Sequence, residues 1–293
     1  MKAHDALRSL GLPEHDAYAL PSSQARFADG ERFRIEIPSV EGPDALDAVI
    51  DEAAKRGVPV HRVSQGSGIW MLDDEQIVRM VERGAQAGIE VCLFVGPRAS
   101  WDIGVQASTP GGRVAQGALR GGDQLAYAVD EVTHACTLGL RSVLVADLGL
   151  LDVLAKLKRA GDLPADLVLK VSASLPVTNP ATARVLEDLG ATTLNLAVDL
   201  PLPALAAIRA AVDVPLDLYI ESSDDFGGIV RHYEIPEIVR ICAPVHLKFA
   251  VRNSASIYPS GMHLADFVDK VARERVRRAQ LGLAILARAE ERQ

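Results

Sequence analysis

Short apolar runs rich in Val, Ile and Leu alternate along the chain with longer stretches in which apolar residues recur every three or four positions. The first pattern predicts β-strands and the second predicts amphipathic helices. Eight runs predict strands, at residues 32–37, 58–64, 89–95, 142–147, 167–172, 192–198, 215–221 and 244–251. The predicted helices cover residues 43–56, 73–87, 123–138, 148–160, 180–189, 203–211, 236–241 and about 263–289. Several of them begin with Pro and end at Gly, as helix termini prefer.

The order of these elements predicts the fold. Repeated strand–helix units imply parallel strands joined by right-handed crossovers. Eight such units predict a closed (β/α)₈ TIM barrel, which we assign as a single domain to residues 31–293. Residues 1–30 are expected to form an N-terminal extension that begins with a short helix and could close the bottom of the barrel. The long C-terminal helix leaves room for a homodimer contact.

Two predicted strands carry polar residues on one face. Asp217, Tyr219 and Glu221 share a face of the strand at 215–221, and His246 and Lys248 share a face of the next strand. If the sheet closes into a barrel, these faces point into the lumen, where a charge is costly without a partner, a metal or a substrate. Active sites of this fold form at the carboxyl ends of the strands, so polar residues there are the candidates.

Candidate catalytic residues can carry charge or exchange a proton at this end of the barrel. They are Glu36, His61, Asp147, Lys170, Glu221 and Lys248. Candidate substrate-binding residues lie at the strand ends and in the loops that follow. They are Gln65, Arg98, Asp102, Asn195, Tyr219, Gly227, Gly228, Arg231 and Arg252. If the opposite parity of the second strand faces inward, Arg62 takes the place of His61.

The three carboxylates Glu36, Asp147 and Glu221 have two interpretations. If they converge, they could bind a divalent metal ion, because hard cations prefer carboxylate oxygens. Otherwise they form salt bridges inside the barrel with cations of neighbouring strands. Those cations are Lys170, Lys248 and Arg34.

The other candidates also have alternative roles. Lys170 and Lys248 could act as a general base or form a Schiff base, or could serve as fixed positive charges. His61 is either an acid–base residue or a hydrogen-bonded structural histidine. Gly227 and Gly228 could form a backbone cradle for an anion or the hinge of a lid.

Composition narrows the class of partner. A hydrophobic content of 48% and a formal net charge of −8 indicate a compact protein that does not bind nucleic acid in general. The basic run at 273–278 is best explained as the solvated face of the last helix. We expect a small-molecule substrate, no membrane partner and a cytoplasmic location, because no apolar run has the length of a signal peptide core or a membrane span.

Four segments resemble actinobacterial proteins classed as U32-type peptidases. They are 35-IEIPSVEGPDAL-46, 61-HRVSQGSG-68, 94-FVGPRASWD-102 and 221-ESSDDFGGIVRHYEIPE-237, within a resemblance that spans residues 31 to 282. It implies a barrel, since members of the wider family are similar barrels and some resemble hydroxylating enzymes with an iron–sulfur cluster on grouped cysteines. Cys92, Cys136 and Cys242 are far apart in sequence, so we expect no such cluster here. The resemblance carries over no catalytic residue.

Three functions remain open at this point. The first is a lyase, isomerase or hydrolase that acts on a small polar or anionic substrate through carboxylate and lysine chemistry, with or without a metal ion. The second is a peptidase, as the resemblance implies. The third is a barrel that binds a ligand or a partner without catalysis.

Overall fold

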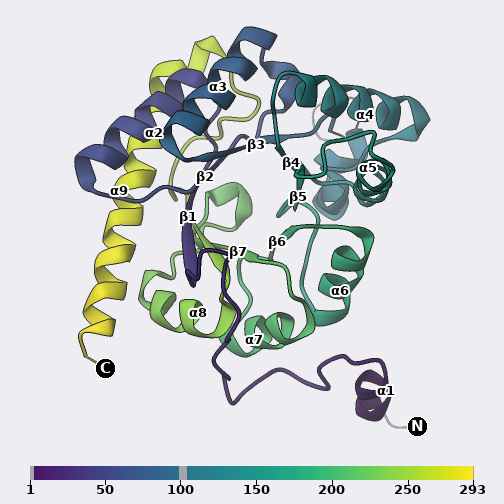
Figure 1. The fold of residues 1–293 in the computed structure, drawn as a ribbon, viewed down its shortest axis with the longest axis vertical. Coiled ribbons are helices and arrows are strands. Elements are labelled where there is room, and N and C mark those ends of the chain that lie inside the picture. Colours follow the sequence, from purple (N-terminus) through teal and green to yellow (C-terminus); the bar gives the residue numbers. More distant parts are fainter. Residues whose placement is uncertain (1–2, 99–103, 293) are drawn as a thin grey trace.

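A closed barrel of eight parallel strands, arranged in chain order and surrounded by helices, forms the body of the molecule (Figure 1). This computed structural model describes residues 3–98 and 104–292. The strands are β1 (Phe33–Pro38), β2 (Arg62–Ser64), β3 (Glu90–Phe94), β4 (Ser142–Val145), β5 (Val168–Val171), β6 (Thr193–Asn195), β7 (Leu216–Glu221) and β8 (Val245–Phe249). The predicted (β/α)₈ barrel is confirmed.

The helices follow the predicted order. They are α1 (Ala3–Ser9), α2 (Pro43–Arg56), α3 (Asp74–Ala87), α4 (Gly121–Thr137), α5 (Leu148–Ala160), α6 (Pro180–Leu189), α7 (Leu202–Ala211), α8 (Ile235–Cys242) and α9 (Ala265–Glu290). None of these helices in the described part of the chain is both long and apolar enough to cross a membrane.

The strand register determines which side chains enter the lumen. Glu36 on β1 lies opposite Arg62 on β2 and opposite Lys248 on β8, which closes the barrel. Residues in register on neighbouring strands point to the same face of a sheet. Glu36, Arg62 and Lys248 therefore point inward together, and Ile35 and Ile37 pack outward into the core beneath the helices.

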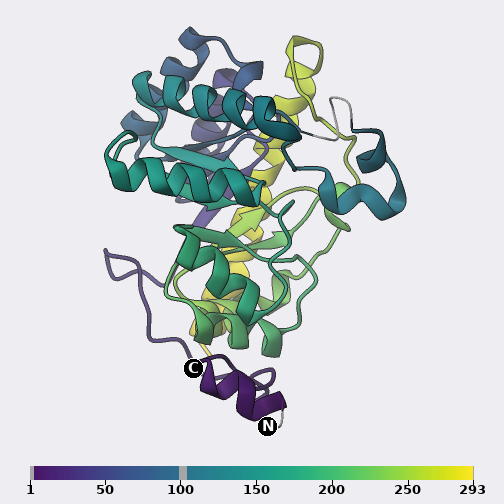
Figure 2. The same cartoon turned by 90° about the vertical axis from the view of Figure 1, so that its right-hand side faces the viewer.

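The N-terminal segment runs along the outside of the barrel beside α7 and α8 (Figures 1 and 2). The backbone N–H of Ala17 donates to Pro203 O at 3.0 Å, and that of Ser23 donates to Arg240 O at 2.9 Å. Phe27 is buried, with its ring 5.0 Å from the ring of His246. The last part of this segment thus reaches the amino ends of β8 and β1.

The long helix α9 runs along one side of the barrel (Figure 1). It has 26 residues, confirming the predicted long C-terminal helix. Gly282 allows it to approach β8, because a Cβ atom at that position would lie 2.7 Å from the ring of Phe249. From this helix the buried Arg275 donates to Ser39 O at 2.7 Å, at the carboxyl end of β1. The outer helix thereby supports a loop of the candidate site.

Candidate active site

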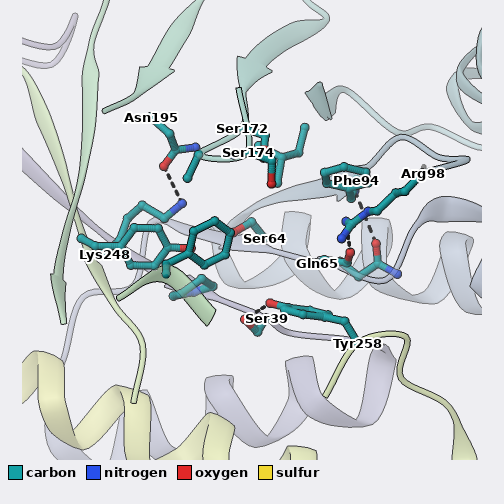
Figure 3. A pocket seen from close by; sticks show the side chains of 16 residues that line it. Ser39, Ser64, Gln65, Phe94, Arg98, Ser172, Ser174, Asn195, Lys248 and Tyr258 are labelled. Atoms are coloured by element: carbon teal, nitrogen blue, oxygen red, sulfur yellow. Dashed lines mark hydrogen bonds between the residues drawn. The ribbon is translucent and has the colours of Figure 1, made fainter. Parts of the chain in front are cut away.

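A polar pocket lies at the carboxyl ends of the strands (Figure 3). It encloses about 400 Å³, including open solvent at its mouth. The described lining includes Ser39, Ser64, Gln65, Phe94, Arg98, Ser172, Ser174, Asn195, Tyr219, Lys248 and Tyr258. These residues come from five of the eight strands and from loops that follow the strands, so a ligand in the pocket would contact much of the barrel.

Lys248 forms the floor of this pocket. Its Nζ donates to Asn195 Oδ1 at 2.7 Å and lies 3.3 Å from Glu36 Oε1. The ring of Tyr219 lies below the ammonium at 4.3 Å, a distance typical of a cation–π contact. Asn195 is held in turn by a bond from its Nδ2 to Val171 O at 2.8 Å. The ammonium is therefore fixed in position by an amide, a carboxylate and an aromatic face.

Beneath the floor, Glu36 lies among three cations. Its Oε2 is 2.6 Å from Lys170 Nζ and 3.5 Å from Arg62 Nη1, and Lys248 approaches its other oxygen. Ser64 Oγ donates to Glu36 Oε1 at 2.7 Å. Burial alone would raise the pKa of Glu36, but Lys170, Lys248 and Arg62 outweigh burial and hold the pKa well below its usual range. Glu36 is thus a permanent carboxylate at neutral pH.

Asp217 completes this buried ionic cluster. Its oxygens lie 2.9 Å from Lys170 Nζ and 3.0 Å from Arg62 Nη1, and Thr193 Oγ1 donates to it at 2.7 Å. Burial would raise the pKa of Asp217, but Lys170, His246 and Arg62 lower it well below its usual range. His246 Nδ1 lies 2.9 Å from Asp217 Oδ1, although the ring is not aligned for a hydrogen bond.

Arg98 and Tyr258 form the outer wall of the pocket. The guanidinium of Arg98 stacks over Phe94 at 3.5 Å and donates to Gly66 O. Burial lowers the pKa of Arg98 to about 10, so the group stays cationic at neutral pH. Tyr258 shares a hydrogen bond with the Ser39 hydroxyl (Figure 3). Ser39 has a φ of +60°, a left-handed conformation that is strained for a residue with a side chain.

The three predicted metal carboxylates do not converge. Asp147 caps α5, because its oxygens accept from Leu150 N at 2.9 Å and from Leu119 N at 3.0 Å. Glu221 accepts from Arg252 N at 3.0 Å and lies 3.2 Å from His232 Nε2. Within residues 3–98 and 104–292, no three His, Cys, Asp or Glu side chains are grouped so that they could hold a metal ion. Glu36 instead forms salt bridges inside the barrel with Lys170 and Lys248, as the alternative interpretation expected. The third expected cation, Arg34, pairs with Asp29 at 2.7 Å.

His61 and Gln65 have different positions. His61 is partly buried outside the lumen, where its Nδ1 accepts from Ile35 N at 3.1 Å, and burial lowers its pKa. Of the two residues considered for the second strand, Arg62 and not His61 points into the lumen. Gln65 does line the pocket, with its Nε2 bonded to Gly68 O at 2.8 Å.

The remaining candidates lie outside the lining of the polar pocket. Arg231 is buried and donates to Leu200 O at 2.9 Å, so it joins two loops. Gly227 and Gly228 both have positive φ, and Arg252 lies 3.6 Å from Asp224. Asp102 lies outside the described residues.

Several residues in or beneath the pocket were not among the first-choice candidates. Arg62 and Asp217, which lie beneath the pocket, had a usable signal, since each lies on a predicted strand in register with a chosen residue, Glu36 or Asn195. Ser39, Ser174 and Tyr258 lie in loops, where no periodicity reports the direction of a side chain. Their place in the site depends on loop geometry alone.

Comparisons with known proteins agree with the fold. The family model described as Peptidase family U32 matches residues 114–223. The predicted resemblance to U32-type peptidases is confirmed. The matched segment includes Lys170, Asn195 and Tyr219, and it ends before Lys248. A search of curated proteins finds no significant match.

Two solved structures are similar to this chain at low identity. The U32 peptidase Mk0906 is 18% identical, with 76% of this chain and 94% of that chain covered and a TM-score of 0.44. A putative fructose-1,6-biphosphate aldolase from Coccidioides immitis is 16% identical, with coverage of 88% and 94% and a TM-score of 0.52. The aldolase match, with its TM-score above 0.5, supports the barrel fold and no particular chemistry.

Proposed function

We propose that this protein is an enzyme that acts on a small anionic substrate held in the polar pocket. The charge of the pocket carries this proposal. Its described lining contains the cations Lys248 and Arg98 and no Asp or Glu side chain. The Ser172 hydroxyl and the second N–H of the Asn195 amide supply further hydrogen-bond donors. A small carboxylate or phosphate fits this combination, because cationic clefts concentrate anions and polar groups then orient them.

Lys248 is the proposed catalytic residue. Its partners Asn195, Glu36 and the Tyr219 ring all interact favourably with a positive charge. A fixed ammonium that faces a substrate carbonyl stabilises the negative charge that develops on oxygen in an oxyanion or enolate. This role fits a lyase or an isomerase that reacts next to a carbonyl group.

Glu36 and Lys170 support that cation from below. Glu36 remains ionised among Lys170, Lys248 and Arg62, so it holds the ammonium groups in place and does not donate a proton. Neither Glu36 nor Lys170 is part of the described pocket lining. We therefore propose both as positioning residues, and Lys248 as the group that touches the substrate.

The test is binding and turnover of small anions. Calorimetric titration with a panel of small carboxylates and phosphates, each beside its uncharged amide or alcohol analogue, should reveal anions that bind at least tenfold more tightly than their analogues. Lys248→Met should abolish that preference and any turnover. Equal affinity for anions and neutral analogues would contradict the proposal.

Peptide hydrolysis is the second candidate function, and the U32 family match favours it. Among the described residues, no serine of the polar pocket forms a hydrogen bond with a histidine, so the pocket lacks a serine–histidine pair. Peptide cleavage by purified protein that disappears in Lys248→Met would favour this candidate. Cleavage that persists in the variant would come from a contaminant.

The third candidate is a barrel that binds a ligand without turnover. The mutual pairing of Glu36, Lys170, Asp217 and Arg62 favours it, since those charges need no ligand to be satisfied. Anion binding that depends on Lys248, with the bound compound recovered unchanged after long incubation, would identify this function.

A further inference from the structure

A second concave site lies on the outer surface between the 3₁₀-helix Ile69–Met71 and helices α3 and α4. We call it the Trp70 groove. It encloses about 820 Å³, including open solvent. Apolar side chains dominate its lining, among them Ile69, Leu72 and Ile77. The described lining residues of this groove and of the polar pocket do not overlap.

Two large aromatic side chains are exposed in the groove. Trp70 is 53% exposed and Tyr127 is 63% exposed. The indole of Trp70 lies against two glycines, because a Cβ atom on Gly68 or Gly96 would lie 2.6 or 2.8 Å from its Nε1. Aromatic surface that is already held in place binds a ligand with little ordering cost.

Glu131 adds a carboxyl group, which is ionised above about pH 7, to this apolar surface. Its two oxygens accept from Trp70 N at 2.7 Å and from Gly96 N at 3.0 Å, which fixes the carboxyl group between two loops. Burial raises the pKa of Glu131 to about 7, and no Lys, Arg or His forms an ion pair with it within the described part of the chain. The second carboxylate, Asp74, is already 2.9 Å from His134 Nε2.

We propose that the Trp70 groove binds a small organic cation, with its ammonium group beside Glu131 and its apolar body against Trp70 and Tyr127. Aromatic faces and a carboxylate both attract a cation, and the aliphatic lining favours an apolar body. The same carboxylates repel an anion. The groove therefore selects the opposite charge from the polar pocket, and its ligand is independent of the proposed reaction.

Phenethylamine is a suitable probe, because it joins a primary ammonium group to an aromatic ring. The sequence contains two tryptophans, so full-length protein with Trp101→Phe reports on Trp70 by fluorescence. Phenethylamine should bind at least tenfold more tightly than phenethyl alcohol, and 3-phenylpropionate should bind more weakly than either. Glu131→Gln should abolish the preference for the amine. The control variant Asp130→Asn removes the same charge from the neighbouring exposed position of α4, and it should keep the preference for the amine.

Glu131→Gln also replaces one of the two oxygens that accept from Trp70 N and Gly96 N, so this variant could lose binding through a local folding defect. A second variant therefore tests the groove without changing Glu131. Tyr127→Ala changes a side chain that is mostly exposed and should weaken phenethylamine binding at least threefold. Equal affinity for the amine and the alcohol, or amine binding that neither variant changes, would overturn the proposal. A shift from dimer to monomer in Tyr127→Ala would also overturn it, since the groove would then be a contact between two copies of this chain.

Discussion

Lys248 Nζ donates a hydrogen bond of 2.7 Å to Asn195 Oδ1 at the floor of the polar pocket. This bond joins β8 to β6 across the lumen and leaves the ammonium at the surface that a ligand would meet. Asn195 therefore fixes the position of the Lys248 ammonium group.

Replacing the cation should weaken anion binding. Lys248→Met should weaken a bound carboxylate or phosphate roughly 10- to 100-fold, because a buried charge-assisted hydrogen bond contributes about 1.5–3 kcal/mol. Calorimetric titration measures this effect. Lys156→Met, at an exposed ion pair with Asp152, is the matched control and should bind as the wild type does. Unchanged affinity in Lys248→Met would exclude the proposed role of Lys248.

Replacing Glu36 should instead reduce stability. Glu36→Gln leaves the fully buried Lys170 with one carboxylate fewer, and breaking a buried ion pair costs about 3–5 kcal/mol. Urea unfolding at pH 7 measures the loss in free energy of unfolding. Glu14→Gln breaks the exposed ion pair with Arg8 and should leave the unfolding midpoint almost unchanged. Equal midpoints for the two variants would show that the buried cluster adds no stability.

The buried His246 predicts a pH dependence of stability. Burial, and then the nearby Arg62, lower its pKa from 6.5 to about 4. Between these values the unfolded chain binds a proton that the folded protein does not, so stability falls as the pH decreases through this window. The full effect is about 3 kcal/mol, from about 1.4 kcal/mol per pKa unit.

The measurement for His246 is a difference between two proteins. Urea unfolding of wild type and His246→Gln between pH 7 and pH 4.5 isolates the contribution of the histidine. The comparison is necessary because the raised pKa of Glu131 gives the opposite slope in part of this range. Parallel stability curves for the two proteins would contradict the prediction.

The conformation of Ser39 predicts different stabilities for two small substitutions. Ser39→Gly removes the strain of a φ of +60°, whereas Ser39→Ala keeps it, so the Gly variant should be more stable by about 1 kcal/mol. Both variants lack the hydroxyl that contacts Tyr258, and both should bind the anionic ligand with similarly reduced affinity. Thermal unfolding and calorimetric titration measure the two effects separately. Greater stability of the Ala variant would show that the backbone is not strained.

The fold could be predicted from the sequence because its signal is repeated eight times. Each strand run is followed by a helix with a Gly or Pro at an end, and an error of several residues at one boundary does not change the architecture. The predicted strand at 58–64, for example, is shorter in the structure, at Arg62–Ser64, without any effect on topology.

The site was less predictable because it depends on pairings across the lumen. Strand parity predicts that Glu36 and Lys248 point into the lumen. It does not predict whether Glu36 pairs with Lys170 or converges with Asp147 and Glu221 on a metal ion. The role of Asp147 had a local signal, since an Asp directly before a helix is a common cap. Tyr258 reaches the pocket through a loop that has no periodic pattern.

The buried cluster of Glu36, Arg62, Lys170 and Asp217 also closes the barrel interior beneath the polar pocket. The pocket is consequently a blind chamber and not a passage. A compound that enters must leave by the same mouth, so substrate and product cannot pass one another. In steady-state kinetics, product inhibition should then be competitive with the substrate, and two small anions should bind in turn rather than together.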